Sequence, residues 1–379
     1  MKIVADEKIP QVAAAFADLG QVQLVVGRDI SAQHLTDCDC LLVRTVTRVN
    51  QALLSDSPVR FIGSATIGTD HIDHEYLQKQ GIGFANAAGC NAEAASEYVV
   101  SGLFALSTSM GFDPFKRKAG IIGYGNVGAS LYRKLEALGI PCLVNDPPLQ
   151  HREHSGQDFV DLDTLLRECD FISLHVPLSL DGEHPSYHLL DKLKIENLRR
   201  GCLLVNAARG EVVDNRALLE VLKQRDDLVV FLDTWENEPL ISRELLQRVD
   251  LATPHIAGYS VEGRLRGTQI ILDAACTYFA TTSSWRMSRL LPETRSLSAP
   301  RGKSRLEFWQ QLFQSHCDIW RDHKALSAGE NLVDAAFARH FDSLRQVYPD
   351  RLEYDRFVIS ATLDKNITGK IQQLNFGIA

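Results

Sequence analysis

Short apolar runs alternate with helix-like segments along most of this chain, and this alternation restricts its fold more than any other feature. In residues 1–90 the runs KIVAD, QLVV, CLLVR, RFIGSA and GIGFANA have the length and composition of strands. The segments between them, such as PQVAAAFADLG and HEYLQKQG, have helical spacing and end at glycine. Strands separated by helices predict a parallel sheet with right-handed crossovers.

A second set of the same kind begins at residue 119. Its predicted strands are AGIIG, PCLVND, FISLHV, CLLVNAA, LVVFLDT and LATPH, and this number suits a doubly wound dinucleotide-binding sheet. The helical stretch at 92–110 is expected to link two domains. A second helical run, at 262–280, is expected to return the chain to the first domain.

The last quarter of the chain has a different composition. Residues 281–305 are rich in Ser, Thr, Arg and Pro, which predicts a linker. Residues 306–379 contain FWQQLFQSHCDIW and NLVDAAFARHFDSLRQVY, both with helical spacing, and a possible strand, RFVISATL. The aromatic stripe of this tail is expected to pack either in a dimer or within its own chain; its members are Phe308, Trp309, Phe313 and Trp320.

The composition excludes some classes of protein. A formal net charge of −8 argues against a general nucleic-acid binder, although a local arginine cluster can still bind a small anion. No apolar stretch reaches 18 residues and the N-terminus lacks a signal-peptide pattern, so we expect no membrane span and a cytoplasmic protein. The scattered cysteines, and His71 and His74 in a structural turn, predict no metal site.

A glycine turn follows the first strand of the second set. Gly123, Gly125 and Gly128 form the pattern G-x-G-x-x-G between the strand AGIIG and the amphipathic helix ASLYRKLEALG. Such glycines allow pyrophosphate to approach the N-terminus of the helix. Asp146 ends the next strand, where it can accept the ribose hydroxyls and repel a 2′-phosphate, so the pattern favours NAD over NADP. A purely structural glycine turn is the alternative.

Three motifs at the ends of later predicted strands carry the candidate chemistry. VNAARG contains Arg209, DTWENEP contains Glu238, and TPHIAG contains His255. A guanidinium can bind a substrate carboxylate, an imidazole can remove a hydroxyl proton as hydride leaves, and a carboxylate can orient that imidazole. Open parallel sheets place their ligands at this edge. Taken singly, the three residues can also be explained as a surface turn, a loop and a structural histidine.

The motifs GIIGYGNVG, LLVNAARGEVVDNRAL, DTWENEP and TPHIAG together resemble those of the D-isomer-specific 2-hydroxyacid dehydrogenase family, over about residues 40–270. The resemblance implies NAD as cofactor, Arg209 on the substrate carboxylate, His255 in proton transfer and Glu238 as the partner of the histidine. It also implies a set of residues that contact the cofactor: Gly123, Gly125, Asn126, Val127, Gly128, Asp146, Val176, Ala207, Asp233 and Gly258.

The family fold implies the domain organisation. We expect an α/β protein with a flavodoxin-like substrate (lid) domain made of residues 1–92 and 260–280, and a Rossmann-like doubly wound NAD-binding domain made of residues 93–259. Residues 281–305 are then the linker, and residues 306–379 an α+β C-terminal domain to which the resemblance assigns homodimerisation.

Four more segments resemble one branch of this family, whose members oxidise a phosphorylated four-carbon 2-hydroxy acid on the route to pyridoxal phosphate. They are LLVRTVTRVN, IGSATIGTDHID, DGEHPSYHLLD and TPHIAGYSVEGRLRGT. The resemblance implies that Thr45, Thr66 and Tyr259 contact the substrate, with Arg44 nearby. Thr45 stands where the branch has serine, and Val176 stands where it has threonine, so a hydroxyl contact to the cofactor is lost there.

The residues themselves leave alternatives open. Arg44 with the hydroxyls of Thr45, Thr47 and Thr66 forms a phosphate site if their loops converge, and otherwise a solvated face. Arg345 or Arg351 of the tail is a further candidate for the phosphate, from a partner subunit. Other D-2-hydroxy acids, 3-phosphoglycerate or glycerate, are alternative substrates, and an NAD-sensing corepressor-like binding protein is the alternative outside enzymes.

Overall fold

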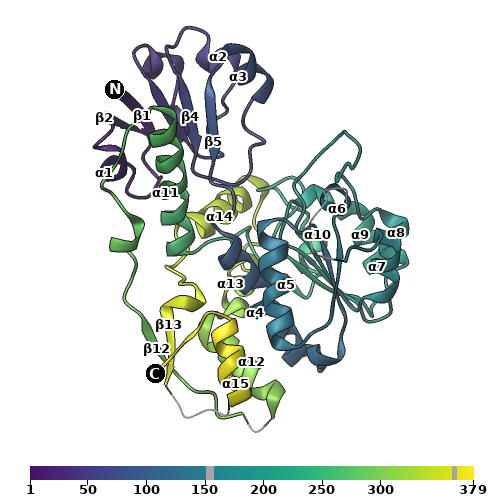
Figure 1. Ribbon diagram of the computed structural model, residues 1–379. Helices are drawn as coiled ribbons and strands as arrows, with labels where there is room; N and C mark the ends of the chain where they lie inside the picture. Colours follow the sequence, from purple (N-terminus) through teal and green to yellow (C-terminus); the bar gives the residue numbers. More distant parts are fainter. Residues whose placement is uncertain (151–157, 303, 361–364) are drawn as a thin grey trace. The chain divides into compact units, whose positions relative to one another are not determined.

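The computed structural model describes residues 1–150, 158–302, 304–360 and 365–379 (Figure 1). The chain forms two compact units. The first contains Met1–Ala92 and Ser260–Glu293, and the second contains Glu93–Tyr259 and Thr294–Ala379. The C-terminal segment therefore belongs to the same compact unit as the predicted nucleotide-binding region.

The first unit is built on a five-stranded parallel sheet in the order β2-β1-β3-β4-β5, the flavodoxin-like order. Ile3 and Ala5 face α1 and α11, while Val4 faces the layer of α2 and α3, so both faces of the sheet are buried. The strands are β1 (Lys2–Asp6), β2 (Gln21–Val25), β3 (Cys40–Val43), β4 (Phe61–Ser64) and β5 (Gly83–Asn86). The helices are α1 (Val12–Phe16), η1 (Gly27–Asp29), η2 (Ala32–Leu35), α2 (Gln51–Leu54), α3 (His74–Gln80), α11 (Val261–Tyr278) and η5 (Met287–Arg289).

The second unit contains a six-stranded parallel sheet in the order β11-β10-β9-β8-β6-β7. The strands are β6 (Ala119–Ile122), β7 (Cys142–Asn145), β8 (Phe171–Leu174), β9 (Leu203–Asn206), β10 (Val229–Leu232) and β11 (Leu251–Ala252). The strand order reverses between β6 and β8, so the carboxyl ends of these neighbours form the switch point at which doubly wound sheets bind ligands.

Helices cover this sheet and connect its strands (Figure 1). They are α4 (Ala92–Met110), η3 (Pro114–Lys116), α5 (Asn126–Leu138), α6 (Pro147–Gln150), α7 (Leu162–Glu168), α8 (Lys192–Glu196), η4 (Gly210–Val212), α9 (Asn215–Leu222) and α10 (Arg243–Leu246). None of the helices among the described residues is both long enough and apolar enough to span a bilayer.

The C-terminal segment adds helices and a small parallel sheet in the order β12-β13-β14. Its elements are β12 (Arg295–Ser298), α12 (Arg305–His316), α13 (Ile319–Ser327), α14 (Asp334–Gln346), η6 (Tyr354–Arg356), β13 (Phe357–Ser360), α15 (Lys365–Gln373) and β14 (Gly377–Ile378). The predicted linker at 281–305 thus carries a strand, because β12 pairs with β13. The predicted strand at 356–363 is described only to residue 360.

Two details of this segment differ from a simple reading of its sequence. The run FWQQLFQSHCDIW spans two helices, because the carboxylate of Asp318 accepts the N–H of Arg321 at 3.2 Å and starts α13. Phe308, Trp309 and Phe313 are buried within a single chain, and the ring of Phe313 lies 4.8 Å from that of Phe104 in α4. These three rings are therefore core residues of the second unit.

Candidate functional site

The glycine turn after β6 has the shape that a dinucleotide requires. Gly123 adopts φ 92°, and a β-carbon there would lie 2.7 Å from the carbonyl of His175. A β-carbon on Gly128 would lie 1.9 Å from the carbonyl oxygen of Gly123, whereas one on Gly125 would meet no atom within 4 Å. Gly123 and Gly128 therefore pack directly against neighbouring backbone, whereas the space around Gly125 is open. Gly125 is the N-cap of α5, where backbone N–H groups are available to a phosphate.

Asp146, directly after β7, stands beside this turn. Its Oδ2 accepts the N–H of Tyr124 at 2.7 Å and its Oδ1 accepts the N–H of Leu149 at 3.0 Å. These bonds hold the half-buried carboxylate next to the glycines, and its remaining lone pairs can still accept hydroxyls. The chemistry of this donor and acceptor set fits an adenosine ribose and pyrophosphate.

The loop after β8 forms the opposite side of the switch point. The Nε2 of His175 lies 2.8 Å from the Oγ of Ser173, and burial lowers the pKa of His175 to about 3, so the imidazole is neutral. Val176 packs against the core, and a β-carbon on Gly123 would lie 2.8 Å from its Cγ1. Val176 thus offers apolar surface, and no hydroxyl, beside the glycine turn.

His255 and Glu238 form a direct pair. The Nδ1 of His255 lies 2.8 Å from Oε2 of Glu238, and Oε1 of Glu238 accepts the backbone N–H of Trp235 at 2.9 Å. Burial by itself raises the pKa of Glu238, but the charge and hydrogen bond of His255 outweigh it, and the pKa lies below its usual value. An ionised carboxylate only accepts hydrogen bonds, so Nδ1 carries the proton and Nε2 is left as the basic nitrogen.

The loop that carries His255 is held by a buried aspartate. Oδ1 of Asp233 accepts the hydroxyl of Thr253 at 2.6 Å and the N–H of Ile256 at 2.9 Å, and its Oδ2 accepts the N–H of Ala257 at 3.0 Å. His255 itself adopts φ 56° and donates its N–H to the carbonyl of Asp233 at 2.7 Å. The carboxylate of Asp233 therefore positions the histidine loop, a role that the sequence motif does not reveal.

Arg209 lies in the loop after β9, the neighbour of β10. Its Nη1 donates to the carbonyl of Ala208 at 2.8 Å, and its own carbonyl accepts from Nδ2 of Asn206 at 2.8 Å. A β-carbon on Gly210 would lie 1.9 Å from the carbonyl carbon of Trp235, so the Arg209 and Glu238 loops are in direct contact. The ends of β9, β10 and β11 thus bring the three predicted groups to one edge of the sheet.

A second contact between these loops escaped the sequence analysis. The N–H of Asn215 donates to Oε2 of Glu236 at 3.1 Å, and the N–H of Glu236 donates to Oδ1 of Asn215 at 3.2 Å. His188 joins them through Nε2, which lies 2.6 Å from Oε1 of Glu236. Together with Asp214, the side chains of His188 and Glu236 offer three ligand atoms within 4.8 Å of one another. These hydrogen bonds explain the cluster as a brace between loops.

The residues after His255 contact the C-terminal segment. The ring of Tyr259 lies 6.1 Å from that of Tyr348, and the guanidinium carbon of Arg345 lies 6.0 Å from the Tyr259 ring centroid. Arg351 donates through Nη2 to the carbonyl of Ala257 and, at 3.3 Å, to that of Ala94. Both tail arginines therefore reach the candidate site from within the same chain.

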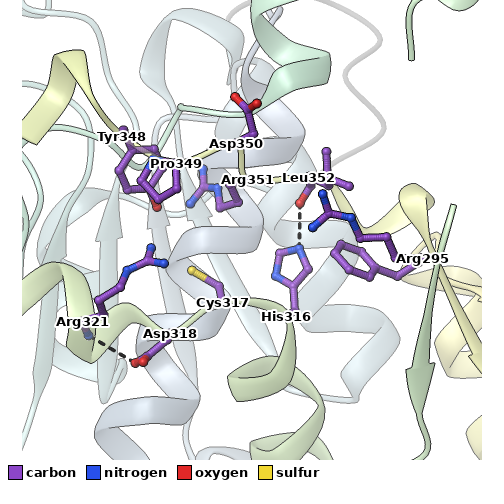
Figure 2. A pocket seen from close by; sticks show the side chains of 11 residues that line it. Arg295, His316, Cys317, Asp318, Arg321, Tyr348, Pro349, Asp350, Arg351 and Leu352 are labelled. Carbon is purple, nitrogen blue, oxygen red and sulfur yellow. Dashed lines mark hydrogen bonds between the residues drawn. The ribbon is translucent and has the colours of Figure 1, made fainter. Parts of the chain in front are cut away.

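Arg351 also lines a cavity of about 280 Å³ in the C-terminal segment. Figure 2 shows its guanidinium between Tyr348 and Leu352, with Arg321 below and Arg295 on the opposite side. Because Arg351 donates a hydrogen bond to the carbonyl of Ala257, it helps to hold the loop that carries His255 in place.

The predicted substrate residues of the first unit follow β3 and β4. Arg44 donates to both oxygens of the fully buried Asp6, through Nε at 2.9 Å and Nη2 at 3.3 Å. The hydroxyl of Thr66 lies 2.9 Å from that of Ser64, which lies 3.2 Å from Nε2 of His71. Much of the Arg44 guanidinium is thus used by an internal ion pair.

The hydroxyl groups of Thr45 and Thr47, which follow β3, differ in their exposure to solvent. Thr45 is exposed, whereas Thr47 is buried and donates to the carbonyl of Gly27 at 2.7 Å. The hydroxyl of Thr47 therefore has a structural role. Thr45 and Thr66 are the residues at this sheet edge whose hydroxyls can still bind a substrate.

Comparison with known proteins agrees with this geometry. Residues 83–257 match the family model described as D-isomer specific 2-hydroxyacid dehydrogenase, NAD binding domain. The chain is 43% identical over 380 residues to erythronate-4-phosphate dehydrogenase of Klebsiella pneumoniae, covering 99% of this chain and 98% of the relative. It is 45% identical to the Pseudomonas paraeruginosa protein of the same name, covering 93% of each. This chain belongs to the D-isomer specific 2-hydroxyacid dehydrogenase family. It is an NAD-dependent oxidoreductase.

Solved structures support the fold. The 3-phosphoglycerate dehydrogenase of Entamoeba histolytica bound to NAD⁺ matches with a TM-score of 0.64 and 23% identity, covering 74% of this chain and 95% of that one. The D-lactate dehydrogenase of Aquifex aeolicus matches with a TM-score of 0.58 and 22% identity, covering 74% and 96%. The flavodoxin-like and Rossmann-like sheets predicted from the sequence are thereby confirmed as the fold of this family.

Proposed function

We propose that this enzyme oxidises 4-phospho-D-erythronate to (R)-3-hydroxy-2-oxo-4-phosphooxybutanoate, with transfer of hydride to NAD, in pyridoxal 5′-phosphate biosynthesis. The observation that carries the chemistry is the hydrogen bond between His255 and Glu238 at the sheet edge that also holds Arg209. The choice of substrate is supported by the erythronate-4-phosphate dehydrogenases, which match this chain over nearly its whole length.

In this mechanism each side chain has one task. The guanidinium of Arg209 binds the carboxylate of the substrate through two parallel hydrogen bonds. The Nε2 of His255 accepts the proton of the 2-hydroxyl group, and Glu238 stabilises the imidazolium that forms. A bound NAD would supply the hydride acceptor for the same carbon. Such general-base assistance typically contributes about 10²–10⁴-fold to a rate.

The remaining predicted residues are assigned to binding. Asp146 and the turn of Gly123, Gly125 and Gly128 hold the cofactor, with Asn126, Val127, Val176, Ala207, Asp233 and Gly258 around it. Thr45, Thr66 and Tyr259 bind the substrate, with Arg44 nearby. The negative charge of Asp146 disfavours a 2′-phosphate, which makes NAD the better cofactor than NADP.

We also propose that residues 1–92 with 260–280 act as the substrate (lid) domain and that the enzyme is a cytoplasmic homodimer joined by residues 306–379. Burial of Phe308, Trp309 and Phe313 within one chain removes them as interface residues. The exposed Val333 and Val347 at the two ends of α14 remain for such a contact.

The test is turnover of a substrate panel by the purified protein. The panel contains 4-phospho-D-erythronate, 3-phosphoglycerate and D-glycerate, each with NAD and a 2-oxo acid that reoxidises bound NADH. We expect the phosphoerythronate to react with the highest kcat/KM and its 2-oxo product to appear by mass spectrometry. A higher kcat/KM for another acid would make this chain a different D-2-hydroxyacid dehydrogenase. NAD binding without turnover of any acid would favour a binding protein.

A further inference from the structure

We propose that Arg345, in the last turn of α14, binds the phosphate group of the substrate and thereby sets the preference for a phosphorylated acid. This inference rests on the proposed function, because it assigns a residue to one group of the proposed substrate. It also gives the C-terminal segment a direct part in the active site.

The position of Arg345 is the first argument. Its guanidinium carbon lies 6.0 Å from the ring centroid of Tyr259, a predicted substrate residue four positions after the base. The carboxylate of Glu238 is close enough for the positive charge of Arg345 to lower the Glu238 pKa. Arg345, Tyr259 and Glu238 all belong to the second compact unit, so this neighbourhood lies within one packed body.

The second argument is that part of the Arg345 guanidinium has no partner. Its Nε is buried and has no hydrogen-bond partner among the described residues, although the side chain forms a hydrogen bond with Tyr259. A buried donor without a hydrogen bond is costly, and a ligand can supply the missing acceptor. Burial acts to lower the pKa of Arg345, but Tyr259 and Glu238 raise it further, so the group stays charged.

Neighbouring arginines of the same segment show the contrast. Arg351 donates to two backbone carbonyls, those of Ala94 and Ala257, and Arg321 forms an ion pair with Asp322 at 2.8 Å. Arg321 is thereby paired with a carboxylate, and Arg351 supports two backbone segments, although its Nη1 is buried without a hydrogen-bond partner. Arg345 differs from both in lying beside Tyr259 and Glu238 of the candidate site.

The chemistry of the proposed substrate supplies the missing partner. Its carboxylate is assigned to Arg209, which leaves a phosphate dianion to be bound at the other end of a four-carbon chain. The planar fork of a guanidinium matches phosphate oxygens, and hydrogen bonds between charged groups are roughly twice as strong as neutral ones. The side chain of Tyr259 forms a hydrogen bond with Arg345 and helps to hold the guanidinium in place.

The first experiment compares two acids that differ only in the phosphate. We expect Arg345→Gln to raise KM for 4-phospho-D-erythronate by about 10- to 100-fold, the equivalent of about 1.5–3 kcal/mol for a lost charged hydrogen bond, and to raise KM for D-erythronate by a much smaller factor. Arg345→Lys should restore part of the loss, since it keeps the charge. Arg339→Gln, an exposed position on the same helix, is the matched control.

The competing role is electrostatic support of Glu238. In that case Arg345→Gln would reduce kcat for both acids by the same factor and shift the acid limb of the pH–kcat profile, and this result would overturn the proposal.

A second measurement needs no turnover. Titration calorimetry with inorganic phosphate should detect binding to the wild-type enzyme and to Arg339→Gln but none to Arg345→Gln, and equal binding by all three would overturn the proposal. Phosphate binding that depends on Arg345, together with no turnover of phosphoerythronate, would separate failure of the proposed function from failure of this assignment.

Discussion

The two parallel sheets of this enzyme end differently at their carboxyl edges. After β1 and β3 of the first unit, Asp6 and Arg44 neutralise each other, and after β4 the hydroxyls of Ser64 and Thr66 share a hydrogen bond. After β10 and β11 of the second unit, His255 is bonded through Nδ1 to Glu238 and one third of its side chain is exposed. The second edge therefore presents a basic nitrogen, whereas the first presents hydroxyls and a satisfied cation. The difference agrees with the proposed roles, in which the second unit carries proton transfer and the first unit only binds substrate.

The largest expected effect tests the second edge. His255→Gln should lower kcat by about 10³-fold, within the range typical of general bases, while KM and NAD binding change little. Steady-state kinetics and calorimetry with NAD measure both. Arg216→Gln, a surface position with 89% of its side chain exposed, is the control. A fall in kcat of less than tenfold would place the base elsewhere and break the comparison.

The second largest expected effect concerns the ion pair between Arg44 and Asp6 in the first unit, and it is an effect on the free energy of unfolding. Arg44→Gln leaves the fully buried Asp6 without its partner, so the free energy of unfolding should fall by about 2–3 kcal/mol, somewhat below a fully buried pair because Arg44 is 32% exposed. Urea unfolding measures the change. The double variant Asp6→Asn, Arg44→Gln should recover much of it. An unchanged unfolding midpoint, with KM strongly raised, would instead make Arg44 a substrate residue.

Buried neutral histidines predict acid sensitivity in both units. The pKa is lowered to about 4 for His71 and to about 3 for His175 and His316, mainly by burial. Because the folded pKa lies below the unfolded one, the unfolded state binds the extra proton and stability falls with pH below about 6.5. Each histidine should cost about 2 kcal/mol between pH 7 and 5. His316→Gln should reduce this slope in urea unfolding across that range, and an unchanged slope would contradict the assignment.

The smallest effect tests the hydroxyls of the first edge. Thr66→Val keeps the shape of the side chain but removes its bond to Ser64 and any bond to substrate. KM should rise by about 5- to 10-fold, as for one neutral hydrogen bond, with kcat unchanged. If kcat fell instead, the first unit would share in the chemical step.

Local patterns predicted the sheets well. The run KIVAD coincides with β1, and the long helix at 92–110 coincides with α4, because strand and helix periodicity depend on neighbouring residues. β12 was missed because its exposed residues have no apolar pattern and its pairing partner β13 lies about sixty residues later. The break between α12 and α13 depends on one capping aspartate within a continuous helical pattern.

The candidate site was predictable as residue types at strand ends, but not as a set of contacts. The pairing of Glu238 with His255 follows from the adjacency of β10 and β11. The inward bonds of Asp233, the Asn215–Glu236 brace and the approach of Arg345 to Tyr259 depend on tertiary packing, which no local spacing encodes. In the sequence these residues can be recognised only as polar residues, with nothing to indicate which partners they contact.

The left-handed backbone of His255, at φ 56°, has a consequence for the evolution of this enzyme. A side chain in that region costs about 1–2 kcal/mol, and glycine would avoid the cost. The proposed base therefore occupies a position where glycine, which cannot transfer a proton, would be the more stable residue. Selection for heat resistance alone would favour its loss, and only selection for turnover keeps the imidazole in the loop.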